Sequence, residues 1–135
     1  MNEPTTKSLE RGQNSGALIY VVDDEPLLLQ LASVILEPLG CTVKTFGTAE
    51  LALEAFKSEK PPPALIITDY MMHAMTGMEL LEACRQIRPR QKTLLVSGTV
   101  GEEVFRNVAE KPNGYLVKPY QAKQLIDAVE AMLAD

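Results

Sequence analysis

The chain has 135 residues, of which 46% are hydrophobic, 23% charged and 5% aromatic, a composition typical of one globular domain with its own core. This composition excludes disorder over most of the length, and the early apolar run 17–22 is far shorter than the roughly 20 residues of a membrane-spanning helix. The formal net charge of −5 argues against direct binding to DNA or RNA as the main function.

The first sixteen residues differ in character from the rest of the chain. They carry charges of both signs and no apolar stretch, which excludes a signal peptide and predicts a flexible leader over 1–16 before a domain at 17–135. The two cysteines, Cys41 and Cys84, lie in apolar segments and match no metal-ligand spacing. We therefore expect two small core residues in a cytoplasmic protein, where thiols stay reduced, and no contact with a membrane.

Five short segments are candidate β-strands by length and residue type. Three of them are almost continuously apolar, as strands buried on both faces are. In chain order, the segments are 17–22, 42–45, 64–68, 93–97 and 115–117.

Stretches with helical spacing of apolar residues follow each strand. Thr76 and Glu79 form a capping-box pattern before the third helix, and Pro38 and Gly40 are expected to end the first. The regular alternation of strand and helix predicts a single α/β domain, a doubly wound, five-stranded parallel sheet with helices on both faces. The apolar stripes are Leu28, Leu31, Ala32 and Ile35, then Ala49, Ala52, Leu53 and Phe56, then Leu80, Cys84 and Ile87, then Val104, Phe105 and Val108, and finally Leu125, Val129, Met132 and Leu133.

Reactive side chains follow four of the five predicted strands. Ligands of open parallel sheets bind outside the carboxyl ends of the strands, so these side chains are expected to meet at one edge. The groups are Asp23, Asp24 and Glu25 after the first strand, Asp69 after the third, Ser97, Gly98 and Thr99 at the fourth, and Lys118 and Pro119 after the fifth.

Converging carboxylates repel one another, and a divalent cation relieves that repulsion. Oxygen ligands supplemented by water and a phosphate suit Mg²⁺ better than Zn²⁺. A nearby lysine can pair with a carboxylate or a phosphoryl oxygen, and a serine hydroxyl can donate to another. The predicted site therefore has the groups needed for in-line transfer of a phosphoryl group to an aspartate.

At these residues the chain resembles the receiver domain of two-component response regulators, over about 17–133. The resemblance implies strand order 2-1-3-4-5. For a chain of one domain, it implies a stand-alone receiver in bacterial two-component signalling. The motifs are Val-Asp-Asp-Glu-Pro at 22–26, Asp-Tyr-Met-Met at 69–72, Met-Thr-Gly at 75–77, Val-Ser-Gly at 96–98 and Gly-Tyr-Leu-Val-Lys-Pro-Tyr at 114–120.

The resemblance also implies a role for each residue that transfers or senses the phosphoryl group. Asp69 would be the phosphoacceptor, Lys118 its counter-cation, and Ser97 the hydroxyl that moves toward the phosphoryl group. Tyr115 would turn inward with Ser97, and the Lys118–Pro119 peptide bond would be cis.

For the metal, the resemblance implies Mg²⁺ with three ligands from the protein. Asp24 and Asp69 would bind it directly, the backbone carbonyl of Met71 would complete the protein's share, and Asp23 would act mainly through water.

Three residues depart from the usual family pattern and bear on loop rigidity and phosphoryl lifetime. His73 stands where Pro is usual, Gly98 where Ala is common, and Met71 where a polar residue is frequent. As the only histidine, His73 is interpreted as a loop residue, with a catalytic or metal role as the alternative. At least half of the cluster Met71, Met72, Met75 and Met78 is expected to pack the loop and the third helix, with a binding surface as the alternative.

The leading functional hypothesis is a phosphorylation-controlled switch that takes its phosphoryl group from a sensor histidine kinase or a phosphotransfer protein. In the family the first helix is where the kinase's helical domain docks, and Leu27 and Leu29 widen the apolar side of that helix here. The output is either binding of a downstream protein or passage of the phosphoryl group along a relay. Two alternatives stay open: a magnesium-dependent aspartyl-phosphate phosphatase, and a degenerate receiver that acts as a scaffold.

Overall fold

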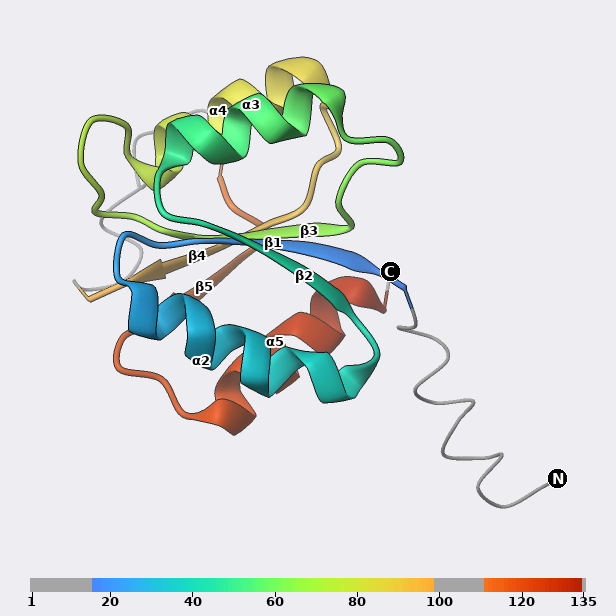
Figure 1. Cartoon of the computed structure of the whole chain (residues 1–135), viewed down its shortest axis with the longest axis vertical. Coiled ribbons are helices and arrows are strands. Elements are labelled where there is room, and N and C mark those ends of the chain that lie inside the picture. The colour runs from blue at the N-terminus through green and yellow to red at the C-terminus, as the bar shows by residue number, and fades with distance from the viewer. Residues whose placement is uncertain (1–15, 99–110, 135) are drawn as a thin grey trace, which may run out of the picture.

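Five parallel strands form one sheet in the order β2-β1-β3-β4-β5 in the computed structural model, which describes residues 16–98 and 111–134 (Figure 1). The expected class and strand order are therefore confirmed, with boundaries that differ from the expected ones by one residue at most. The strands are β1 (Leu18–Val22), β2 (Thr42–Phe46), β3 (Leu65–Asp69), β4 (Thr93–Ser97) and β5 (Gly114–Val117).

The register of the sheet brings the carboxyl ends of the strands to one edge. Val22 of β1 pairs with Thr68, and the next residue of β3, Asp69, pairs with Val96 of β4. Ser97, the last residue of β4, in turn lies opposite Val117 of β5. The residues that follow β1, β3, β4 and β5 thus leave the sheet side by side.

Helices cover both faces of the sheet, α2 and α5 on one side and α3 and α4 on the other (Figure 1). The predicted capping box is present, with Thr76 and Glu79 exchanging hydrogen bonds at the start of α4. No helix among the described residues is long and apolar enough to cross a membrane. The helices are α2 (Pro26–Leu36), a 3₁₀ turn η1 (Glu37–Leu39), α3 (Ala49–Ser58), α4 (Gly77–Ile87) and α5 (Ala122–Leu133).

Two expectations lie outside the described residues. The helix expected around Val104 and Phe105 lies within 99–110, which is not described. Of the leader expected at 1–16, only Gly16 is described. The end of the first helix follows the prediction, because η1 contains Pro38 and Gly40 adopts a left-handed φ of 91° after it.

The core has one part on each face of the sheet because neighbouring strand residues point in opposite directions. Ile19 and Val21 pack with Leu36 and Leu125 beneath α2 and α5. Tyr20 and Val22 pack on the other face, with Phe56 of α3, and each such fully buried large side chain contributes about 1.5–3 kcal/mol. Both predicted core cysteines are buried and free.

The prediction of which α2 residues face the core was partly wrong. Leu31 is 46% exposed, whereas Leu29, expected outside the core stripe, packs against the core with Ile35. Apolar residues occupy nearly every position from 27 to 36, so their spacing does not define one face, and contact with the sheet decides it. In α4, Ile87 was also predicted to be buried but is 48% exposed, because it lies at the helix end.

Candidate functional site

The two aspartates after β1 are fixed by the backbone around them. The N–H of Asp23 donates to the Phe46 carbonyl at 3.1 Å, which holds the chain beside the end of β2. The Oδ1 atom of Asp23 accepts from the N–H of Glu25 at 2.9 Å, closing a short turn before α2. Asp23 is buried as a result, and Asp24 is left at the surface of the site, partly exposed.

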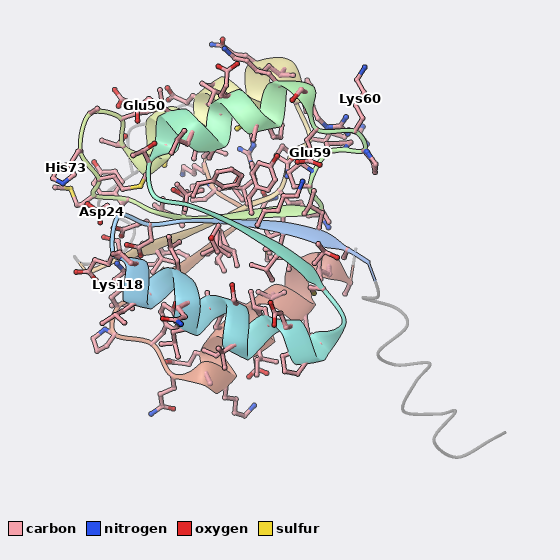
Figure 2. The ribbon with its side chains drawn as sticks, viewed as in Figure 1. Asp24, Glu50, Glu59, Lys60, His73 and Lys118 are labelled. Carbon is pink, nitrogen blue, oxygen red and sulfur yellow. The ribbon has the colours of Figure 1, made fainter. Side chains whose placement is uncertain are left out.

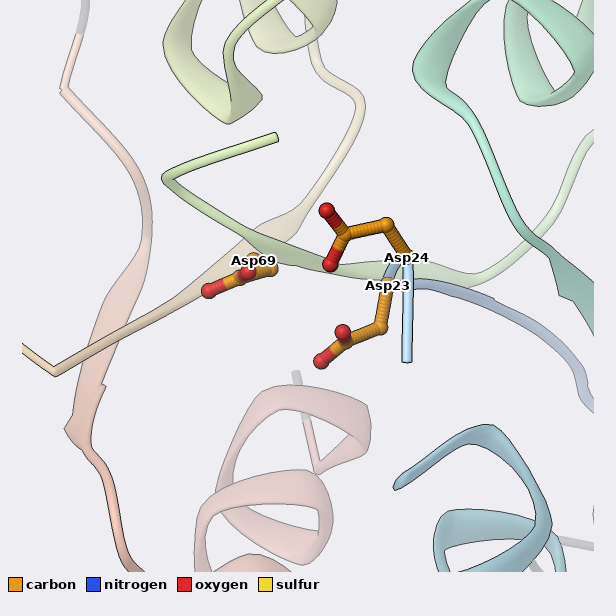
Figure 3. Close-up of side chains that lie close together, drawn as sticks. All are labelled: Asp23, Asp24 and Asp69. Carbon is orange, nitrogen blue, oxygen red and sulfur yellow. The ribbon is translucent and has the colours of Figure 1, made fainter. Parts of the chain in front are cut away.

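Three carboxylates and one ammonium group meet at this edge. Figure 3 shows Asp23, Asp24 and Asp69 close together at the strand ends. One carboxylate oxygen of each lies within 4.8 Å of the others. The Lys118 Nζ lies 3.1 Å from Oδ2 of Asp23 and 3.3 Å from Oδ1 of Asp69. Three carboxylates beside one ammonium leave two negative charges when all are ionised, which matches the charge of a divalent cation.

Burial dominates the electrostatics of the phosphoacceptor candidate. The pKa of Asp69 is raised from its ordinary 3.8 to about 6. Burial is the largest cause, Lys118 acts to lower this pKa, and the charges of Asp23 and Asp24 act to raise it. Burial also acts to lower the pKa of Lys118, but the hydrogen bond and charge of Asp23, together with Asp69, outweigh it and raise that pKa. Lys118 is therefore charged at neutral pH. Asp69 is then mostly ionised, and a bound cation would stabilise its carboxylate.

The backbone around Asp69 is held in place by β4 on one side and by the start of α4 on the other. The Thr68 hydroxyl donates to the Asp69 carbonyl at 3.0 Å, and a Cβ on Gly77 would collide with that carbonyl. The N–H of Tyr70 donates to Val96 at 2.8 Å, and the Tyr70 carbonyl accepts from Gly77 at 2.9 Å. The start of α4 is thereby packed directly onto the end of β3, which leaves little freedom for the Asp69 backbone.

The residues expected to sense the phosphoryl group lie on β4 and β5. Ser97 is completely buried at the end of β4, and its carbonyl accepts from the Lys118 N–H at 2.8 Å. Tyr115 is partly buried and packs against a cluster that includes Met78 and Leu95. The Lys118–Pro119 bond is cis, as the resemblance implied, and so is Lys60–Pro61.

Two residues that depart from the family pattern lie in the loop after β3. Met71 is 60% exposed, so its side chain is not part of the core. The Nε2 atom of His73 lies 3.6 Å from Oδ2 of Asp24, a contact that the sequence analysis missed. Ala74 has a left-handed φ of 45°, a conformation rare for residues other than Gly, and no signal in the sequence indicates it. Thr99 lies outside the described residues.

Comparison with known proteins identifies the family. The model of the response regulator receiver domain matches residues 19–130. The phosphate regulon transcriptional regulatory protein PhoB of Rhizobium meliloti is 34% identical over an alignment of 122 positions, which covers 85% of this chain and 51% of that protein. The chain spans about half the length of this and of other curated regulators that it matches.

Solved structures agree in fold. A CheY-like response regulator receiver domain protein from Methanospirillum hungatei is 30% identical, with a TM-score of 0.80 over 89% of this chain and 95% of that one. The response regulator TrrA of Thermotoga maritima, solved in complex with Mg²⁺ and BeF, is 26% identical, with a TM-score of 0.74 over 85% and 97%. The chain therefore belongs to the receiver domain family of two-component response regulators, whose role is phosphorylation-controlled signalling.

Proposed function

We propose that this receiver accepts a phosphoryl group on Asp69 in a reaction that it catalyses itself with bound Mg²⁺. The observation that carries the proposal is the position of the Lys118 Nζ, which lies within ion-pair distance of both Asp23 and Asp69. This ammonium can stay beside Asp69 and contact an oxygen of the incoming group without leaving the site. A degenerate scaffold would have no need of this arrangement.

The residues present fit Mg²⁺ on their donor chemistry. The three carboxylates supply hard oxygen ligands, and the raised pKa of Asp69 reflects mutual repulsion, in addition to burial, that a cation would relieve. Asp24 and Asp69 would hold the ion directly, with the Met71 carbonyl and, through water, Asp23. When bound, Mg²⁺ would neutralise charge on the phosphoryl oxygens during transfer.

The transfer itself is assigned to the protein's own groups. An Oδ atom of Asp69 forms a bond to phosphorus while the bond from phosphorus to the donor, a phosphohistidine nitrogen, breaks. The donor is a sensor histidine kinase or a histidine phosphotransfer protein, and the leaving imidazole keeps the electron pair. Lys118 pairs with one phosphoryl oxygen, and the Ser97 hydroxyl donates to another. Loss of the group is the corresponding attack by water, also within this site.

The proposed response is a shift between two conformations. A phosphoryl group adds negative charge and acceptor oxygens, which Ser97 and Lys118 satisfy by closing onto them. The movement of Ser97 makes room for Tyr115, whose packing against Leu95 and Met78 then changes. A beryllofluoride complex should therefore shift NMR signals of Tyr115 as well as those beside Asp69, and shifts confined to the metal loops would contradict this coupling.

We assign kinase docking to the outer side of α2. Leu27, Leu31 and Val34 recur there at helical spacing, and Leu27 is 77% exposed. An exposed apolar stripe of this kind is typical of a protein-binding surface. The downstream step, binding of a partner protein or passage to a further histidine, uses the same phosphorylated state. The buried, unpaired cysteines suit a cytoplasmic location.

The experiment is exposure of the full chain to acetyl phosphate with and without Mg²⁺. We expect a mass increase of one phosphoryl group that needs Mg²⁺ and is lost in Asp69→Asn and strongly slowed in Asp24→Asn. Asp127→Asn in α5, whose carboxylate pairs with Lys123 on the surface, is the matched control and should be labelled like the parent. Turnover without label would support the phosphatase, and neither label nor turnover would support the scaffold.

A further inference from the structure

His73 lies at the edge of the acidic cluster, although nothing in the proposed transfer uses it. Its Nε2 atom is 3.6 Å from Oδ2 of Asp24, and its side chain is 92% exposed. Figure 2 shows the two residues next to each other at the end of the molecule where Lys118 also lies. An imidazole so exposed has lost little hydration, so it can rotate toward a ligand at small cost.

The contact has a separation that suits two ligands of one metal ion. Ligand bonds of about 2.1 Å that meet at angles between about 90° and 180° place the two ligand atoms about 3.0 to 4.2 Å apart. The distance of 3.6 Å between Nε2 and Oδ2 falls inside this range. An ion on Asp24 could therefore also be reached by His73 with only a small adjustment of the loop.

The neighbouring carboxylates are less free to bind on that side. Asp23 is engaged by the Lys118 ammonium at 3.1 Å and by the backbone of Glu25 at 2.9 Å. Asp69 is engaged by the same ammonium at 3.3 Å. Asp24 is the member of the cluster whose carboxylate faces the imidazole, so a nitrogen ligand enters the site beside it.

We propose that His73 is an additional, nitrogen ligand that makes the acidic cluster bind transition-metal ions such as Zn²⁺ more tightly, relative to Mg²⁺, than carboxylates alone would. This inference rests on the metal site of the proposed function. Imidazole binds Zn²⁺, Cu²⁺ and Ni²⁺ well, whereas Mg²⁺ prefers oxygen ligands and retains water. His73 thus changes which divalent cation occupies the cluster, in competition with the one that supports phosphoryl transfer.

The test uses the fact that the chain contains a single histidine. NMR of the imidazole nitrogens in the full chain reports on His73 alone. We expect Zn²⁺ to shift the signal of the ligating nitrogen and Mg²⁺ to leave it nearly unchanged. Calorimetric titration of both ions should show that His73→Gln lowers the ratio of Zn²⁺ to Mg²⁺ affinity at least about tenfold, the lower end of what even outer-shell changes cost.

Two variants and one control decide the outcome. Asp24→Asn should abolish the zinc-induced shift, because the imidazole binds as part of the cluster. Glu50→Gln removes a charge from an exposed residue of α3 at the same end of the molecule and should leave the ratio unchanged (Figure 2). A zinc shift that persists in Asp24→Asn, or an unchanged ratio in His73→Gln, would overturn the proposal. Magnesium-dependent labelling of the parent by acetyl phosphate reports separately on the proposed function.

Discussion

Gly77, the first residue of α4, lies directly against the backbone carbonyl of Asp69, so closely that no side chain fits between them. We predict that Gly77→Ala pushes α4 away from the end of β3, lowering the free energy of unfolding by about 1–3 kcal/mol, as overpacking commonly does. Phosphorylation by acetyl phosphate should slow at the same time, because Asp69 is displaced relative to Lys118. Urea unfolding and mass spectrometry measure the two effects.

The matched control for this substitution is Gly47→Ala. A Cβ at Gly47 meets nothing within 4 Å, and its φ is not in the left-handed region. It should therefore fold and be phosphorylated like the parent. Equal behaviour of the two variants would show that the contact between Gly77 and Asp69 carries no constraint.

Lys118 is predicted to hold the pKa of Asp69 down. That pKa is raised to about 6, mainly by burial, and Lys118 is the largest influence in the opposite direction. Lys118→Gln should therefore raise the pKa of Asp69 above 6 in the metal-free protein, as measured by NMR titration of its carboxyl carbon. Lys123→Gln removes an exposed lysine that pairs with Asp127 in α5, so it should leave the titration of Asp69 unaltered. A fall in the pKa of Asp69 in Lys118→Gln would refute the electrostatic account.

Much of the fold could be predicted because three of the strands are almost continuously apolar, and a polar residue marks the end of each of β1, β3 and β4. Asp69 ends β3 and Ser97 ends β4 as expected, since parallel strands bring their carboxyl ends together whatever the helices do. The buried face of a helix is harder to predict where apolar residues occupy most of its positions. Leu29 and Leu31 exchange their expected environments because both satisfy a helical period, and only packing on the sheet distinguishes them.

The meeting of Lys118 with Asp23 and Asp69 could also be predicted, since it depends only on strand order and strand ends. The contact between His73 and Asp24 could not, because it depends on a loop that turns through a left-handed Ala74. The Tyr20 hydroxyl donates a hydrogen bond of 2.6 Å to Glu59, a residue 39 positions further along the chain. This contact likewise has no local signal in the sequence.

The raised pKa of Asp69 predicts how stability depends on pH without metal. The folded protein holds this proton more tightly than the unfolded chain, whose carboxyl has its ordinary pKa of 3.8. The ionised group therefore costs stability above about pH 6, and the cost disappears as the pH falls toward 3.8. Asp69→Asn should raise the free energy of unfolding at pH 7 by up to about 3 kcal/mol, and the gain should shrink between pH 6 and 4.

Urea unfolding in chelator across this pH range measures the difference between Asp69→Asn and the parent. Asp127→Asn, an exposed carboxylate in α5, serves as the control and should show no gain at pH 7. A gain for Asp69→Asn that is the same at pH 4 and pH 7 would mean that packing, and not charge, is responsible.

Met71 is predicted to prolong the life of the phosphoryl group. Hydrolysis of an aspartyl phosphate needs a water in line with the bond that breaks. In the family, the residue two positions after the phosphoacceptor borders the path of that water. The thioether is 60% exposed, so it can cover the approach without being fixed in the core, and it has no carboxylate or amide to orient water. Met71→Asn should therefore lose phosphoryl faster than the parent at the same Mg²⁺ concentration, as measured by the decay of the phosphorylated mass. Met71→Leu keeps an apolar side chain of similar size and should decay like the parent. Equal or slower loss from Met71→Asn would show that the side chain does not shield the site.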